Sequence, residues 1–330
     1  MHTKWPISMR VGIVTPAPPR SRYGNRVTAL RWARILRGLG HRVRLEQDYA
    51  GEQYDVMVAL HARRSHDAIA RFHRERPGAP LIVTLTGTDL YQDIRTSAEA
   101  QESLEIASRL VLLQPKGIEE LRTDLQRKAR VIYQSVAMRP ATAAQADTAP
   151  KRGTFDVCVI GHLRDVKDPF RAALAARLLP VSSRVRVLQI GGELEDGWGR
   201  QARAEMAANP RYRWLGEQPR WRVFQLLRRS QLSVLSSKLE GGANVLGETI
   251  VARVPVLASR IAGSIGLLGE DYPAYFDVGD TPELARLLQR AENDAAFMAD
   301  LRSRCERLAP TFEPAGERAA WAALLSELAG

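Results

Sequence analysis

Cysteine and long apolar runs are scarce in this sequence, and their scarcity removes several kinds of site. The 330 residues include two cysteines, Cys158 and Cys305, far apart and in apolar surroundings. This pattern favours a reducing compartment, and it excludes a disulfide framework and a metal site built on thiolates. No apolar run reaches the roughly 18 to 20 residues that cross a bilayer, so we expect no membrane partner.

The first residues also lack a targeting signal. MHTKWPISMRVGIVTPAP has neither the apolar core nor the small-residue cleavage site of a secretory signal. Together with the cysteine count, this predicts a cytoplasmic protein. Met9 offers an alternative start, and we expect residues 1–8 to be a disordered extension.

Lysine is scarce, although the net charge is +11. The basic residues are nearly all arginine and are spread along the chain, which gives weak support for a phosphate-bearing ligand. Against that background, Lys167 and Lys238 stand out. The Gly-x-Gly-x-x-Gly pattern of dinucleotide-binding folds is absent after the first strand, so a nicotinamide enzyme is disfavoured.

Apolar strands alternate with helical segments in two series. The length favours two domains, and strands this continuously apolar are buried on both faces of parallel sheets. One predicted helix, residues 25–39, carries Val27, Leu30 and Leu36 at helical spacing. The predicted strands are residues 10–16, 41–45, 55–60, 81–87, 110–114 and 129–135 in the first series, and 155–161, 184–192, 212–216, 232–237 and 254–259 in the second.

These series predict an α/β protein of two doubly wound lobes with the active site in the cleft between them. We expect an N-terminal lobe at 9–140, a polar linker at 141–152, a C-terminal lobe at 153–310, and a final helix at 311–330 that packs back toward the N-terminal lobe.

Two candidate anion loops follow strands of the first lobe. In the first, Arg22, Asn25 and Arg26 lie where a helix begins, which is a natural anion site. The alternative interpretation is that these arginines are ordinary solvated charges of a loop. The second combines LTGTDLY, residues 85–91, with HARRS, residues 61–65. Its threonines can orient a polar ligand and its arginines add charge, whereas Asp89 has the alternative role of capping the next helix.

Two more candidate loops follow strands of the second lobe. GHLRDVKDP, residues 161–169, holds Arg164 and Lys167 three residues apart, so both can converge on a diphosphate. KLEGGANVLGE, residues 238–248, opens a helix near Asn244, whose first N–H groups favour a phosphate. Glu248 then lies one turn in and can accept bonds from the hydroxyls of a ribose. Glu240 can accept bonds from the hydroxyls of a second ring. The alternative is that the whole stretch is a glycine-rich turn whose two carboxylates are solvated.

Glu240, seven residues, Glu248 and then IVARVPVLAS resemble the Glu-x7-Glu motif and the following strand of GT-B glycosyltransferases. GHLRDVKDP is similar to the phosphate loop of that family, and RWLGEQPR to its nucleobase strand and turn. Over nearly the whole chain, segments such as LTGTDLY and SSKLEGGANVLGE resemble the selenosugar synthases of selenoneine biosynthesis. This resemblance implies a GT-B fold of two Rossmann-like lobes.

The implied reaction moves a sugar from UDP-N-acetylglucosamine or UDP-glucose to selenophosphate, with no cofactor and no metal. The resemblance leaves open which of the two UDP-sugars is the donor and whether the anomeric configuration is retained or inverted. It also leaves the oligomeric state open. The implied catalytic residues are Arg164, Lys167 and Glu240. The implied UDP-sugar contacts are Gly161, His162, Gly216, Glu217, Gly241, Gly242, Ala243, Asn244, Val245 and Glu248. The implied selenophosphate contacts are Arg22, Asn25, Arg26, Arg63, Thr86, Gly87, Thr88 and Asp89.

The sequence departs from the broader family at three positions. His162 stands where the phosphate loop usually has arginine, Thr86 where the LTG-type loop often has histidine, and Gly266 where an acidic residue is usual. We therefore expect Arg164 to supply the loop's charge. Selenophosphate is already an anion, so the reaction needs no general base, and no Asp-x-Asp pair ends a strand.

Two other readings remain. A transferase with an oxygen acceptor, such as a glycan or lipid, predicts an apolar or aromatic groove in the first lobe, where the loops instead carry arginines. A basic protein that binds nucleic acid predicts salt-dependent binding to any duplex and leaves the Glu-x7-Glu spacing unexplained. We therefore expect no nucleic-acid partner.

Overall fold

The computed structural model describes residues 8–21, 23–137 and 153–329. Outside these ranges lie residues 1–7 of the expected extension at 1–8, the predicted site residue Arg22 and the predicted linker at 141–152. The contacts divide the chain into two compact units. Unit 1 comprises Met1–Ser135, Glu240–Gly242 and Pro314–Gly330, and unit 2 comprises Val136–Leu239 and Ala243–Glu313. No helix in the described ranges combines the length and apolarity needed to cross a membrane.

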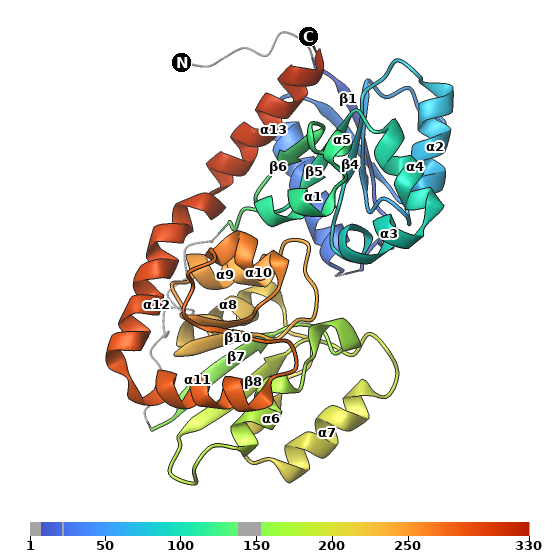
Figure 1. The fold of residues 1–330 in the computed structure, drawn as a ribbon. Coiled ribbons are helices and arrows are strands. Elements are labelled where there is room, and N and C mark those ends of the chain that lie inside the picture. The colour runs from blue at the N-terminus through green and yellow to red at the C-terminus, as the bar shows by residue number, and fades with distance from the viewer. Residues whose placement is uncertain (1–7, 22, 138–152, 330) are drawn as a thin grey trace. The chain divides into compact units, whose positions relative to one another are not determined.

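Unit 1 is built on a parallel sheet of six strands (Figure 1). The chain runs outward from β1 to β2 and then returns to the other side of β1, so the topological switch point lies between β1 and β3. Loops at the carboxyl ends of these two strands are where such sheets bind ligands. In sheet order the strands are β2 (Arg42–Glu46), β1 (Arg10–Val14), β3 (Val56–Leu60), β4 (Leu81–Thr84), β5 (Arg109–Leu112) and β6 (Ala129–Val131).

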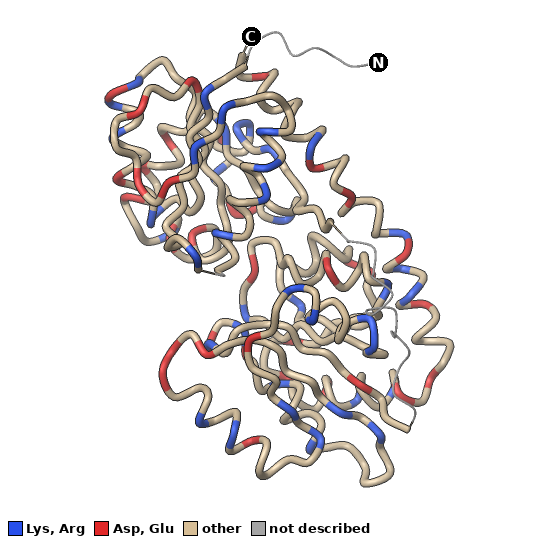
Figure 2. Tube along the Cα trace, turned by 180° about the vertical axis from the view of Figure 1, so that it is seen from behind, with Lys and Arg blue, Asp and Glu red and all other residues tan. Residues whose placement is uncertain are grey.

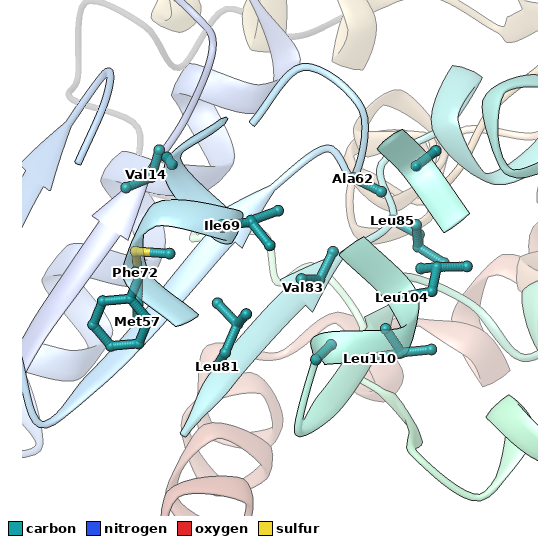
Figure 3. Packing of buried hydrophobic residues seen from close by; sticks show 14 of the residues in the cluster. Val14, Met57, Ala62, Ile69, Phe72, Leu81, Val83, Leu85, Leu104 and Leu110 are labelled. Atoms are coloured by element: carbon teal, nitrogen blue, oxygen red, sulfur yellow. The ribbon is translucent and has the colours of Figure 1, made fainter. Parts of the chain in front are cut away.

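Helices cover both faces of this sheet. On one face, α1 (Gly24–Gly38) and α13 (Pro314–Ala329) bury their apolar residues. On the other, Ile69 and Phe72 of α2 pack with Met57, Leu81 and Val83 of the strands, as Figure 3 shows. The helices of that second face are α2 (His66–Glu75), α4 (Ala98–Ile106) and α5 (Thr123–Gln126), and the π-helical turn Asp89–Asp93 leads into α3 (Ile94–Thr96).

The buried stripe of α1 differs from the one expected. Leu30 is 45% exposed, whereas Thr28, Trp32 and Leu36 are buried at intervals of four residues. Trp32 decides the orientation, because its ring packs edge-on against Trp321 of α13 with centroids 4.8 Å apart. A large aromatic gains more from burial than a leucine, so the stripe is centred on Trp32.

A buried carboxylate fixes α13 in unit 1. Glu317 accepts hydrogen bonds from Trp32 Nε1 at 2.7 Å, from Arg31 Nε at 3.1 Å and from the Ser135 N–H at 2.9 Å. A buried charge is tolerated only when it is paired and hydrogen-bonded, as it is here. The C-terminal helix is therefore part of the unit 1 core.

Unit 2 is a second parallel sheet of six strands, which confirms the predicted fold class. Here the chain switches sides between β7 and β10. In sheet order the strands are β12 (Tyr275–Phe276), β11 (Val256–Ser259), β10 (Leu232–Leu235), β7 (Phe155–Ile160), β8 (Val185–Ile190) and β9 (Tyr212–Trp214). The helices are α6 (Arg171–Arg177), α7 (Trp198–Ala208), α8 (Arg220–Arg229), α9 (Asn244–Val251), α10 (Ala262–Leu268), α11 (Thr281–Asn293) and α12 (Ala295–Leu308).

Candidate functional site

The predicted diphosphate loop, residues 161–169, leaves β7 at the switch point of unit 2. Its first residue, Gly161, lies against the backbone of Gly191 at the end of β8. A Cβ atom on Gly191 would come within 2.0 Å of the Gly161 oxygen, and Gly191 has a φ of 151°. Only glycine fits there, so the ends of β7 and β8 meet backbone to backbone.

Contacts from the end of β10 hold this loop. The Lys238 N–H donates to the Val166 oxygen at 2.9 Å, and Lys238 Nζ lies 2.6 Å from Asp165 Oδ1. Ser236 Oγ donates to the Asp168 oxygen at 3.0 Å. Lys238, which is conspicuous in the sequence, therefore joins the two loops that flank the switch point.

Arg164 and Lys167 bring positive charge to this edge. Both side chains are half-buried. Lys167 lines a small cavity with Gly161, Ser236 and Ser237. Arg164 Nε is buried and has no hydrogen-bond partner within the described part of the chain. A buried cationic donor without a partner is costly, so this position favours an anionic ligand.

His162 does not add to that charge. Its Nδ1 accepts a hydrogen bond from the Gly192 N–H at 3.1 Å, and burial lowers the pKa of the ring. The imidazole is therefore neutral at pH 7, with its proton on Nε2. The positive charge of this loop is therefore carried by Arg164 and Lys167.

The predicted nucleobase turn lies beside the diphosphate loop. Gly216 has a φ of 67°, and its oxygen accepts from the Gly191 N–H at 2.9 Å. A Cβ atom on Gly192 would lie 3.4 Å from the Glu217 side chain and 3.6 Å from the His162 ring. The structure thus brings Glu217 and His162 to the same edge of unit 2.

Glu248 has an arginine partner that the sequence reading missed. Helix α9 begins at Asn244, as predicted, and Glu248 lies one turn in. Its Oε1 is 3.2 Å from Arg220 Nη2, at the first residue of α8, and the Arg220 guanidinium also lies over the Phe224 ring at 5.2 Å. The Glu248 side chain is 14% exposed, so this ion pair lies in a largely enclosed position.

Glu240, the other carboxylate of the motif, is half-buried. By their contacts, Glu240, Gly241 and Gly242 group with unit 1, whereas Ala243, Asn244, Val245 and Glu248 belong to unit 2. The sequence motif is therefore divided between the units.

In unit 1, Asp89 supports two loops at the carboxyl edge of the sheet. Its side chain is fully buried. Oδ1 accepts from the N–H groups of Thr86 and Gly87, both at 2.8 Å, and Oδ2 accepts from the Ala62 N–H at 3.0 Å. Because both oxygens accept from backbone N–H groups of the preceding loops, Asp89 has a structural role, but it supports these loops and does not cap the next helix, as the alternative had proposed.

We expect Asp89→Ala to destabilise unit 1 by about 1–3 kcal/mol, because three backbone donors lose their acceptor. The measurement is urea unfolding followed by tryptophan fluorescence. Asp67→Ala is the control, since the Asp67 side chain is fully exposed and should shift the midpoint little. Equal midpoints for the two variants would contradict a supporting role for Asp89.

The other predicted residues of unit 1 lie at the start of α1 and in the loops after β3 and β4. Asn25 and Arg26 are half-buried in the first turn of α1, and Arg26 Nε is buried without a hydrogen-bond partner among the described residues. Arg63 is 46% exposed, with Nε 3.3 Å from Asp93 Oδ2. Thr88 Oγ1 lies 3.1 Å from His61 Nε2, a second residue that the sequence reading missed.

Charge in both units follows the spread seen in the sequence. Figure 2 shows Lys and Arg distributed along the chain in short separate stretches, with no continuous basic stripe. In the described ranges, no group of three or more His, Cys, Asp or Glu side chains is arranged to hold a metal ion. The basic residues at the carboxyl edges of the two sheets are therefore local groups of charge and not parts of a continuous basic stripe.

Comparisons with known proteins agree with this architecture. Residues 142–310 match the family described as glycosyl transferases group 1. HepE from Anabaena, solved in complex with UDP, is similar in fold, with a TM-score of 0.75 at 16% identity over 97% of this chain and 100% of that one. Sucrose-phosphate synthase from Thermosynechococcus elongatus has a TM-score of 0.77 at 15% identity over 97% and 99%.

No curated protein matches the sequence. The two solved structures share the GT-B fold, which this chain therefore has as well. The family match covers the whole of the α/β sheet of unit 2, including the loops that carry Arg164, Lys167 and Glu248. This chain belongs to the group 1 glycosyltransferases.

Proposed function

We propose that this glycosyltransferase is a selenosugar synthase of the SenB type, which transfers N-acetylglucosamine or glucose from a UDP-sugar to selenophosphate. One observation carries the proposal. Each unit has an arginine in or just after the loop following its first strand, and the Nε atom of each, Arg26 and Arg164, is buried without a hydrogen-bond partner in the described ranges. Two such cations suit a reaction between two anionic substrates.

The donor is assigned to unit 2. Arg164, Lys167 and the N–H groups at the start of α9 would bind the diphosphate, and Glu248 the ribose hydroxyls. Glu240, which groups with unit 1, would orient the sugar. HepE was solved with UDP and with UDP-glucose, which supports a uridine nucleotide as the donor carrier.

The acceptor is assigned to unit 1. Arg26 and Arg63 bring charge, and the threonines of the loop after β4 bring hydroxyl donors. Asp89 would hold that loop in shape and leave its own oxygens bonded to backbone N–H groups. A small tetrahedral anion can use such donors, whereas a glycan or lipid acceptor calls for an aromatic or apolar surface.

The chemistry is a displacement at the anomeric carbon. Selenium supplies the electron pair for the new carbon–selenium bond, the bond from the anomeric carbon to the diphosphate oxygen breaks, and UDP leaves with that electron pair. Water then cleaves the selenium–phosphorus bond and releases phosphate. Positioning and charge stabilisation by basic residues are the protein's main contributions.

The test is incubation of the purified protein with UDP-N-acetylglucosamine or UDP-glucose and selenophosphate. UDP release is measured, and selenium in the product is identified by mass spectrometry. Activity should survive a chelator, because basic side chains supply the charge that a metal would otherwise supply. UDP release without a selenium-containing product, or with a sugar or lipid alcohol as the preferred acceptor, would refute the selenium assignment.

A further inference from the structure

The loop after β3 contains a buried histidine that the proposed function does not use. His61 is 2% exposed and has a φ of 76°. A left-handed backbone at a residue other than glycine costs on the order of 1 kcal/mol or more, so neighbouring contacts must hold it. One such contact is the hydrogen bond from the His61 N–H to the Thr84 oxygen at 2.9 Å.

The hydrogen bonds around His61 define which ring nitrogen carries the proton. The Arg64 N–H donates to Nδ1 at 3.3 Å, so Nδ1 is an acceptor and Nε2 carries the proton of the neutral ring. Nε2 lies 3.1 Å from Thr88 Oγ1 and 3.9 Å from Asp93 Oδ2, and only the first distance is a hydrogen bond. Burial lowers the pKa of His61, which keeps the ring neutral although Asp89 and Asp93 lie nearby.

We propose that His61 is a positioning residue whose Nε2–H orients the Thr88 hydroxyl, so that Thr88 donates its own proton to an anionic oxygen of the acceptor. A hydroxyl has one proton and two lone pairs. The bond from His61 occupies a lone pair and leaves the proton for a partner on the other side. This inference rests on the proposed function, since it requires an anionic acceptor in unit 1.

Two substitutions separate this role from a purely structural one. The carbonyl of asparagine reaches the position of Nδ1, and asparagine tolerates positive φ, so His61→Asn keeps the bond from Arg64 and loses the bond to Thr88. The amide of glutamine reaches the position of Nε2, so His61→Gln keeps the bond to Thr88 and loses the other. The two roles therefore predict opposite outcomes.

The experiment measures kcat and KM for both substrates in His61→Asn, His61→Gln and Thr88→Val. We expect His61→Asn and Thr88→Val each to raise KM for selenophosphate about tenfold, with KM for the UDP-sugar unchanged. His61→Gln should stay near wild type, and Thr88→Ser should do the same because it keeps the hydroxyl. The double variant His61→Asn with Thr88→Val should be no worse than Thr88→Val alone.

Wild-type KM in His61→Asn with a raised KM in His61→Gln would overturn the inference in favour of a structural role. Additive effects in the double variant would overturn it as well. Thiophosphate binding, measured by calorimetry on the same variants, gives a readout that needs no turnover. If the wild-type protein makes no selenosugar, the proposed function fails, and the order of thiophosphate affinities still decides the role of His61.

Discussion

Lys167→Ala should lower kcat by about two to three orders of magnitude, while KM for the UDP-sugar changes much less. The physical reason is that negative charge grows on the diphosphate as its bond to the sugar breaks, so a cation there stabilises the transition state more than the bound substrate. Lys167 lines the cavity at the switch point of unit 2, and burial in this half-enclosed position strengthens its effect on nearby charge. Initial rates of UDP release over a range of UDP-sugar concentrations provide the measurement.

Lys116→Ala is the matched control for Lys167. Lys116 lies in unit 1 and is half-buried like Lys167, with Nζ 3.0 Å from Oε1 of the exposed Glu119, so its loss should change kcat less than twofold. Lys167→Arg should recover part of the activity, since it keeps the charge but changes the donor geometry. A Lys167→Ala variant with unchanged kcat and a raised KM would mean that Lys167 only binds the ground state.

The two sheets could be predicted from the sequence because their strands are continuously apolar. Each of the strands β1 to β11 overlaps a predicted segment, and only β2, which ends at Glu46, and β5, which begins at Arg109, extend one residue beyond it, since burial on both faces leaves an apolar run that can be recognised without knowing its neighbours. The two-residue strand β12 has no such run, and it exists through its pairing with Ala258 and Ser259 of β11. The exposed Leu30 of α1 has a similar cause, because packing with Trp321, far away in the sequence, sets the orientation of that helix.

The location of the candidate site could be predicted from the sequence more easily than the hydrogen bonds and ion pairs between its side chains. Parallel strands place their carboxyl ends at one edge, so the loops that follow β7 and β10 are expected to meet. Which side chains pair within that edge depends on contacts between distant segments, such as Lys238 with Asp165 and Arg220 with Glu248. Residue spacing carries no signal for such pairs.

Glu248→Ala should weaken UDP binding by about tenfold to a hundredfold, the effect of losing a charged hydrogen-bond partner for the ribose hydroxyls. The variant also leaves Arg220 without its carboxylate partner, so Arg220→Ala is measured beside it. Since Arg220 is 53% exposed and lies over Phe224, we expect its removal alone to cost less than Glu248→Ala. Calorimetric titration with UDP gives both affinities without any acceptor.

Glu205 offers a control for Glu248 with the same chemistry in the same unit. Its side chain is 11% exposed and pairs with Arg177 at 2.6 Å, on helices α7 and α6. Glu205→Ala therefore removes a similarly enclosed carboxylate from a similar arginine, and it should leave UDP affinity unchanged. If Glu248→Ala also binds UDP like the wild type, Glu248 does not hold the ribose, and its pair with Arg220 serves only to fix α8 against α9.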